Sequence, residues 1–225
     1  MAIRAVIFDR DGVLTEFDID KAEELLRPLL KMSMIQLAQR WWMWNETIGV
    51  PRSEIEETDL LHGFWTYICD LEGAGDEVRQ ALFNFDYTVT VRPFPDTKPA
   101  LKLCKELGLK VGVLSNFTLA TLDQSLVTSG LAEWMDYVAA APVIGYSKPQ
   151  PESYLHVATQ LGVLPEECVF LDDEPPAVEG ALAVGMKAYW VDRRMLRHDL
   201  AHKKICDFSI LASLLQEEGV ITAVS

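Results

Sequence analysis

The chain contains few cysteines, and none of them are paired. Its four cysteines are widely scattered and form no C-x-x-C spacing: Cys69, Cys104, Cys168 and Cys206. This pattern argues against a zinc site and against thioredoxin-like redox chemistry. Cys168 lies in an apolar run and is expected to be a small buried hydrophobic residue. A reducing compartment fits this cysteine usage, and we expect a cytoplasmic protein.

Long hydrophobic runs are also missing. No apolar stretch approaches the roughly 18 residues that a membrane-spanning helix needs. Near the N-terminus, Arg4 is followed by only four apolar residues before Asp9, which is too short for a signal peptide. We therefore expect a soluble protein with no membrane partner.

Positive charge is scarce. The chain has 20 Lys and Arg against 34 Asp and Glu, which gives a formal net charge of -14. Such a chain is repelled by nucleic acid backbones and anionic lipid, so we expect no nucleic acid partner. It is repelled by phosphorylated substrates as well. A phosphate site in this protein must therefore be made locally positive by a metal ion or a lysine.

Short apolar runs alternate with helical patterns over most of the chain. The runs are continuous and not alternating, which is typical of strands buried on both faces. From about residue 93 onward, the alternation predicts a parallel sheet with right-handed crossovers. The predicted strands are 3–8, 109–114, 137–141, 168–171 and 188–191, and the helices between them are 97–107, 119–129, 151–161 and 176–184.

Residues 16–89 break this rhythm, because they carry helical patterns and no buried-strand run. Helices are predicted over 21–44, with a break at Pro28, and over 54–71 and 76–85. The fold class is therefore α/β: a Rossmann-like parallel sheet with helices on both faces. We expect a core of residues 1–15 and 93–225, interrupted by an all-helical cap of residues 16–92. The chain would cross between the two near residues 15–18 and 88–93.

Acidic side chains follow two of the predicted strands. Asp9 and Asp11 follow the first strand, and Asp172, Asp173 and Glu174 follow the fourth. Alone, each group also fits an ordinary turn, a calcium loop or a helix cap. If the two strands are neighbours, however, their carboxyl ends bring these carboxylates together. Hard oxygen ligands in that number suit Mg²⁺, which keeps waters for a phosphate substrate.

Two further polar sites lie beside predicted strand ends. Ser115 offers a hydroxyl and Asn116 a backbone N–H close to a helix start, a combination that can hold a phosphoryl oxygen. Capping of the following helix explains them equally well. Lys148 precedes Pro149, which favours an extended loop conformation. A solvent-exposed lysine without a function is the simpler interpretation of that position alone.

The order of these signals along the chain is more specific than any one of them. The motifs follow one another in a fixed order: a D-x-D after the first strand, a serine after the second strand, a lysine before a helix, and paired aspartates after the fourth strand. In these motifs the chain resembles the haloacid dehalogenase superfamily of phosphohydrolases. More narrowly, it is similar to the subgroup whose helical cap is inserted between the first motif and the second strand. The resemblance spans essentially the whole chain.

The resemblance implies a role for each matching residue. Asp9 would attack phosphorus and form a covalent aspartyl-phosphate, and Asp11 would protonate the leaving oxygen and later activate water. The phosphoryl oxygens would be held by Ser115 and Lys148, with Asn116 beside them. Mg²⁺ would be bound by the Asp9 carboxylate, the Asp11 backbone carbonyl, Asp173 and Asp172.

Some positions depart from the pattern of the family. Ala177 stands where many relatives carry a second acid or an asparagine, which puts the outer support of the metal in doubt. Arg10 stands between the two aspartates, where an apolar residue is common. True dehalogenases of this superfamily lack the second aspartate, so Asp11 argues against carbon–halogen hydrolysis.

The predicted cap is expected to select the substrate. Trp41, Trp42 and Trp44 cluster there, and adjacent helical residues cannot all share one face. We expect them mainly to pack within the cap, with lining of a pocket roof or a dimer contact as the alternative. Residues 16–18 are a linker or a pocket rim. His198 and His202, four residues apart in a basic stretch, are interpreted as surface residues.

The first functional hypothesis is a Mg²⁺-dependent phosphatase acting on a small phosphorylated metabolite. A phosphotransferase resembling the phosphoglucomutase branch would share every core residue. A phosphonate hydrolase would need a cap lysine such as Lys21 or Lys31 for a Schiff base. A non-catalytic binding module is disfavoured, because the charged motif residues are all present. The sequence leaves open whether the protein is a monomer or a homodimer.

Overall fold

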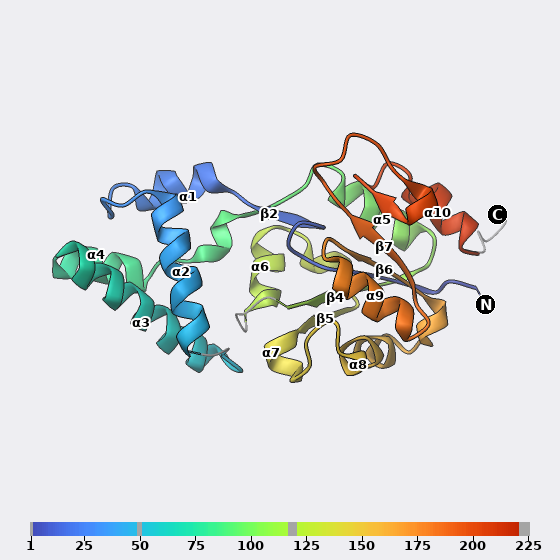
Figure 1. Cartoon of the computed structure of the whole chain (residues 1–225), viewed down its shortest axis with the longest axis horizontal. Helices are drawn as coiled ribbons and strands as arrows, with labels where there is room; N and C mark the ends of the chain where they lie inside the picture. The colour runs from blue at the N-terminus through green and yellow to red at the C-terminus, as the bar shows by residue number, and fades with distance from the viewer. Residues whose placement is uncertain (1, 49–50, 117–120, 221–225) are drawn as a thin grey trace.

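A computed structural model of the chain describes residues 2–48, 51–116 and 121–220, with only the backbone for residues 45–48. Figure 1 shows a sheet flanked by helices at one end of the molecule and a group of helices, α1 to α4, at the other. None of the helices in these described ranges is long and apolar enough to cross a bilayer.

The main sheet has six strands in the order β5-β4-β1-β6-β7-β8, and all of its strand pairs are parallel. β1 lies between β4 and β6, with Phe8 opposite both Val113 and Leu171. The predicted first and fourth strands are therefore neighbours, as the metal-site hypothesis requires. The strands are β1 (Ala5–Phe8), β4 (Lys110–Ser115), β5 (Tyr137–Ala140), β6 (Cys168–Asp172), β7 (Lys187–Val191) and β8 (Lys204–Ile205).

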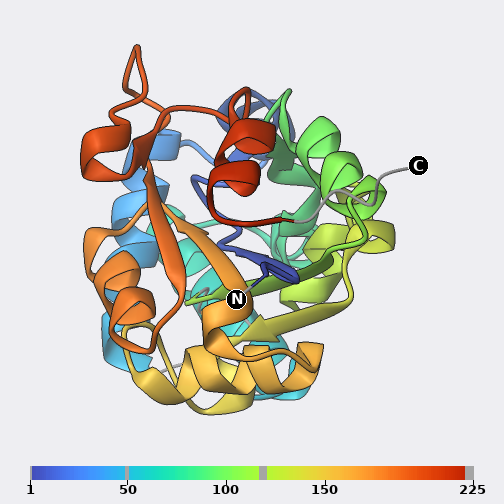
Figure 2. The same ribbon diagram turned by 90° about the vertical axis from the view of Figure 1, so that its right-hand side faces the viewer.

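The strands are apolar throughout because both faces of the sheet are covered. Along β1, Val6 and Phe8 pack into one hydrophobic core, while Ala5 and Ile7 pack into a second core on the opposite face. Figure 2 shows helices on both sides of the sheet. The first core is covered by α5 (Thr97–Glu106), α6 (Leu122–Thr128) and α10 (Leu211–Glu217), and the second by α8 (Pro151–Leu161) and α9 (Pro175–Ala183).

The helix between β5 and β6 shows how closely local signals set the boundaries. α8 begins at Pro151, whose ring fixes the backbone angle of a first helical turn. It ends at Gly162, which adopts the left-handed conformation with φ of 70°. The predicted range 151–161 is confirmed, as is the buried position of Cys168 in the next strand.

The described residues between 19 and 83, which exclude 49 and 50, form four α-helices: α1 (Ile19–Leu26), α2 (Met34–Ile48), α3 (Glu54–Glu72) and α4 (Asp76–Phe83). They enclose a third hydrophobic core, which includes Leu26, Phe64 and Ile68. The predicted break at Pro28 within 21–44 is confirmed, because α1 ends at Leu26 with Arg27 as its C-cap residue and α2 begins at Met34. The assignment of residues 16–92 as a separate cap domain stays a prediction.

The segments that join these helices to the sheet are not simple linkers. β2 (Thr15–Phe17) pairs antiparallel with β3 (Val91–Pro93), and the Arg92 guanidinium donates to Glu16 across the pair at 2.9 Å. The expectation of a purely helical segment from residue 16 is wrong at this point. The two strands are too short to show a periodic pattern, and their pairing partner lies far away in sequence. β8, with two residues, was missed for the same reason.

Gly180 in α9 allows a close approach of the Lys148 loop. A Cβ at this position would lie 2.7 Å from the Tyr154 hydroxyl oxygen and 2.9 Å from the Pro149 carbonyl oxygen. We expect Gly180→Ala to destabilise the fold by about 1–3 kcal/mol, because the backbone of Pro149 must move. Urea unfolding measures the change. The matched control is Glu179→Ala at an exposed site of the same helix, and an equal effect of both variants would contradict the prediction.

Candidate active site

The turn after β1 places two aspartates at the carboxyl edge of the sheet. The backbone N–H of Asp9 donates to Leu171 O at 2.8 Å, which continues the pairing of β1 with β6. Gly12 follows with φ of 72°, and a Cβ there would clash with the carboxylate of Asp173. The left-handed turn conformation therefore favours glycine, and the absence of a side chain leaves room for the Asp173 carboxylate.

Three carboxylates converge at this edge. Asp9, Asp172 and Asp173 each offer one oxygen, and these oxygens lie within 4.8 Å of one another. Asp9 and Asp172 are buried, while Asp173 is exposed. A set of hard oxygen donors with one open side fits a divalent cation that also contacts substrate. The carboxylate of Asp11 is not part of this group.

Lys148 provides the positive charge in the centre of the group. Its ammonium donates to Asp9 Oδ1 at 2.7 Å and to Asp172 Oδ2 at 2.6 Å, and its side chain is only 2% exposed. Burial alone would lower the pKa of Lys148, but the two carboxylates outweigh burial and raise this pKa above its ordinary value. The lysine therefore stays charged, contrary to the simpler interpretation of an exposed loop residue.

Asn116 fixes the loop that carries Lys148. Its side-chain oxygen accepts from Lys148 N at 2.8 Å, and its amide nitrogen donates to Lys148 O at 2.9 Å. In the part of the chain that the structure describes, the next helix, α6, begins at Leu122 with Thr121 as its N-cap residue. The first residues of the predicted helix over 119–129 lie outside the described residues. Ser115 is the last residue of β4 and is buried at the same edge of the sheet. Sequence reasoning found both positions but not this contact of Asn116.

Asp11 lies beside the group and is held by its neighbour. Arg10 is 1% exposed, and its guanidinium donates to Asp11 Oδ2 at 2.6 Å and to Ser125 Oγ at 2.7 Å. Burial raises the pKa of the Asp11 carboxyl, and the charge and hydrogen bond of Arg10 offset part of that rise. Arg10, which the sequence left unexplained, therefore fixes the orientation of Asp11.

A family model for haloacid dehalogenase-like hydrolases matches residues 3–185 of the chain, which include every aspartate described above. The chain belongs to this family. The resemblance in the four motifs is thereby confirmed at the level of the superfamily. The roles of the individual residues stay predictions.

Two relatives of this haloacid dehalogenase-like hydrolase carry phosphatase names. Phosphatase MT3486 of Mycobacterium tuberculosis (strain CDC 1551 / Oshkosh) is 36% identical over 220 residues, covering 97% of this chain and 100% of that protein. Hexitol phosphatase B of Escherichia coli O157:H7 is 28% identical and covers 94% of this chain and 95% of its own length. The similarity to both extends over nearly the full length of each protein.

The solved structure of L-2-haloacid dehalogenase from Xanthobacter autotrophicus with chloropropionic acid covalently bound has the same fold. It matches with a TM-score of 0.68 and 19% identity, covering 95% of this chain and 98% of that one. At this level of identity the match establishes the α/β fold class and nothing about the reaction.

The three tryptophans of α2 in this hydrolase do not share one face of the helix, as helix geometry requires. The ring of Trp41 packs edge-on against Phe64 at 5.0 Å between centroids, and Trp44 stacks on Tyr67 at 5.4 Å. Trp42 points away and is 70% exposed. Trp41 also lines a cavity that borders Asp11, so this one residue both packs within the helices and lines a pocket.

His198 does not match its interpretation as a plain surface residue. It is partly buried beside Cys206 and Asp207, with its Nδ1 3.6 Å from the Cys206 sulfur. The same nitrogen lies 3.2 Å from the Cys206 backbone N–H, which donates to it. His202, in contrast, has a side chain that is 72% exposed and pairs with Asp199.

Charge crowding predicts how the stability of the metal-free hydrolase varies with pH. Burial, followed by the Asp9 charge, raises the pKa of Asp172 to about 7. Because this folded-state pKa lies above the unfolded value, stability falls as the pH rises between these two values. In the presence of a chelator we expect the free energy of unfolding of wild type to fall by on the order of 1–2 kcal/mol between about pH 5 and about pH 7.5, relative to that of Asp172→Asn.

Urea unfolding at several pH values measures this difference. Mg²⁺ favours the ionised carboxylates, so its addition is expected to stabilise wild type more at about pH 7.5 than at about pH 5. Asp70→Asn, at an exposed ion pair far from the site, is the control. Parallel pH profiles for wild type and Asp172→Asn would contradict the prediction.

Proposed function

We propose that the protein is a phosphatase that hydrolyses phosphomonoesters with the help of a divalent metal, through a phosphorylated Asp9. The supporting observation is the buried ammonium of Lys148, which bonds both Asp9 and Asp172 beside the open carboxylate of Asp173. This arrangement supplies positive charge where a net charge of -14 would otherwise repel a phosphate dianion. The phosphatase names of two nearly full-length relatives point the same way.

Asp9 is the proposed nucleophile. In the first step, one of its carboxylate oxygens forms a bond to phosphorus while the bond from phosphorus to the ester oxygen breaks. The Lys148 ammonium reduces the negative charge of Asp9, so that an anionic nucleophile can approach an anionic ester. The Ser115 hydroxyl and the Asn116 backbone, both at the end of β4, are proposed to bind phosphoryl oxygens.

Asp11 is the proposed proton carrier. It gives its proton to the ester oxygen as the alcohol leaves, and it then takes a proton from the water that attacks phosphorus and releases Asp9. Its raised pKa suits a group that is protonated in one step and ionised in the next. The hydrogen bond from Arg10 fixes the side chain and favours the ionised state between the two steps.

The metal is proposed to be Mg²⁺, held by Asp9, Asp172, Asp173 and the Asp11 backbone carbonyl. These are oxygen donors only, which suits a hard cation. When bound, the metal supplies charge neutralisation for the phosphoryl oxygens. Trp190 Nε1 donates to Asp173 O at 2.9 Å and Glu174 N donates to Asp172 Oδ1 at 2.8 Å, so both acids are held in place although Ala177 offers no ligand.

Residues 16–92 are proposed to act as a cap over this site.

The phosphonate hydrolase hypothesis loses support, because neither candidate lysine is placed to form a Schiff base in the site. Lys21 pairs with Glu24 on the surface, and Lys31 donates to the Glu72 carbonyl. Among the described residues that line the cavity beside Asp11 there is no lysine.

Removal of the nucleophile tests the proposal. With p-nitrophenyl phosphate and Mg²⁺, we expect phosphate release by wild type and a fall in kcat of at least about 10³-fold in Asp9→Asn, because the amide is a poor nucleophile. Chelator should abolish the wild-type rate, and Mg²⁺ should restore it.

Asp192→Asn is the matched control, because Asp192 follows the neighbouring strand β7 and its carboxylate contacts Arg194 and not the acidic group. Its activity should remain within about twofold of wild type. Undiminished turnover by Asp9→Asn would rule out the proposed nucleophile.

A further inference from the structure

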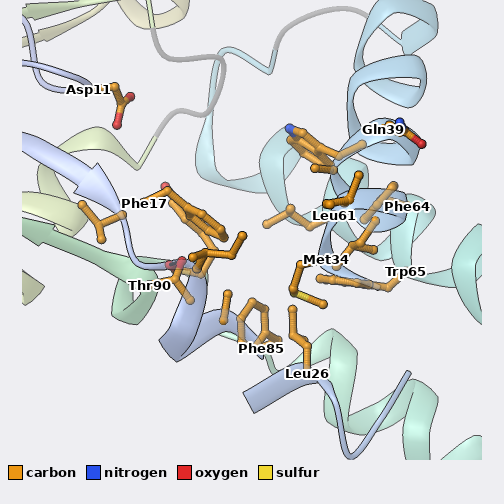
Figure 3. Close-up of a pocket in the computed structure, with 18 of the residues that line it drawn as sticks. Asp11, Phe17, Leu26, Met34, Gln39, Leu61, Phe64, Trp65, Phe85 and Thr90 are labelled. Carbon is orange, nitrogen blue, oxygen red and sulfur yellow. Dashed lines mark hydrogen bonds between the residues drawn. The ribbon is translucent and has the colours of Figure 1, made fainter. Parts of the chain in front are cut away.

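The cavity beside Asp11 has a chemistry that the proposed function does not account for. It has a volume of about 620 Å³ and lies between the turn after β1 and the helices α1, α2 and α3. Figure 3 shows Asp11 on one side of the cavity and Leu61, Phe64, Met34 and Trp65 on the other. A cavity of this size can hold a drug-sized group in addition to a phosphate.

The lining is almost entirely apolar. Arg10 and Asp11 are the only charged residues among its described lining residues. The Arg10 guanidinium is already bound to Asp11 and Ser125. Two of the neutral polar groups are also engaged: Thr90 Oγ1 donates to the Tyr87 carbonyl at 2.6 Å, and the Tyr87 hydroxyl lies 2.8 Å from Thr121 Oγ1. Gln39 adds one side-chain amide to the lining. The cavity therefore offers few hydrogen-bond partners to a ligand.

Several large apolar side chains in this lining are exposed. Phe17 is 59% exposed, Ile19 is 50% exposed and Ile35 is 68% exposed, and all three face the same cavity. They come from β2, α1 and α2, so three separate elements contribute to one apolar surface. An apolar surface of this kind next to catalytic groups marks a binding site for an apolar group.

The position of Asp11 links this cavity to the reaction. A residue that protonates the ester oxygen must lie between the phosphoryl group and the carbon skeleton of the alcohol. Because Asp9 and Lys148 bind on the phosphoryl side, the alcohol must extend from Asp11 into the cavity. A polyol would find few partners for its several hydroxyls there, which costs affinity, whereas an apolar chain gains by leaving water.

We propose that the substrate is the phosphate monoester of an apolar alcohol or phenol, whose hydrocarbon part occupies this cavity. The inference rests on the proposed phosphatase function and names a hydrophobic class of substrate for it. It also distinguishes this protein from its relative hexitol phosphatase B, whose name indicates a polyol ester as substrate.

Alkyl esters of increasing length test the proposal. We expect kcat/KM for ethyl, butyl and hexyl phosphate to rise about two- to fourfold with each added methylene, because the intrinsic reactivity of these esters is nearly constant. Hexyl phosphate should exceed a hexitol 6-phosphate, which has the same number of carbons, by at least about tenfold. Calorimetric binding of the matching alkylphosphonates should show the same trend without turnover, with a negative heat-capacity change.

Two exposed isoleucines provide a matched pair of variants. Ile35 lines the cavity, whereas Ile55, in α3, is 76% exposed and lies outside it. Ile35→Asn should lower kcat/KM for hexyl phosphate several-fold more than for ethyl phosphate, and so flatten the chain-length series. Ile55→Asn should leave the series unchanged.

The outcomes separate the two proposals. Turnover of ethyl phosphate without any gain in rate or binding from chain length, or a preference for the hexitol ester, would overturn the apolar substrate and leave the phosphatase intact. Absence of turnover for every ester would overturn the phosphatase. A homodimer that covers Phe17 and Ile35 and shows no chain-length dependence would assign the surface to a protein interface and overturn this inference.

Discussion

The buried ammonium of Lys148 is the contact on which the site depends. It lies between Asp9 and Asp172, two buried carboxylates whose like charges repel each other. The parallel order of β1 and β6 brings these two acids together, and the loop held by Asn116 brings the lysine to them. Without this cation the acidic edge of the sheet would be costly to fold at neutral pH.

A second pair of charges, Arg10 and Asp11, lies close to Asp9 in the turn after β1. Arg10 is buried, and it fixes Asp11 and contacts Ser125 of α6. The two aspartates of the D-x-D motif therefore have different partners, a lysine for Asp9 and an arginine for Asp11. Different partners for two nearby carboxylates are how a protein assigns them different protonation roles.

The two sides of Asp11 differ sharply in polarity. Toward the sheet lie the charged groups that suit a phosphate. Toward α1, α2 and α3 lies an apolar cavity in a chain whose overall surface charge is strongly negative. The overall composition of the chain predicts the polarity of neither side, because the chemistry of a binding site depends on the few residues that surround it.

The sequence by itself determined the α/β class, most helix boundaries and the positions of the motif residues. Continuous apolar runs such as that before Asp9 have one physical explanation, burial on both faces, and Pro151 and Gly162 mark the ends of a helix locally. The tertiary structure alone decided that strands β1 and β6 are neighbours, that Asn116 binds the Lys148 loop and that Arg10 holds Asp11. It also decided the β2–β3 pair and the apolar cavity. Apart from the contact between Arg10 and Asp11, these features join residues far apart in the chain, and a local pattern carries no information about which distant segment a residue will contact.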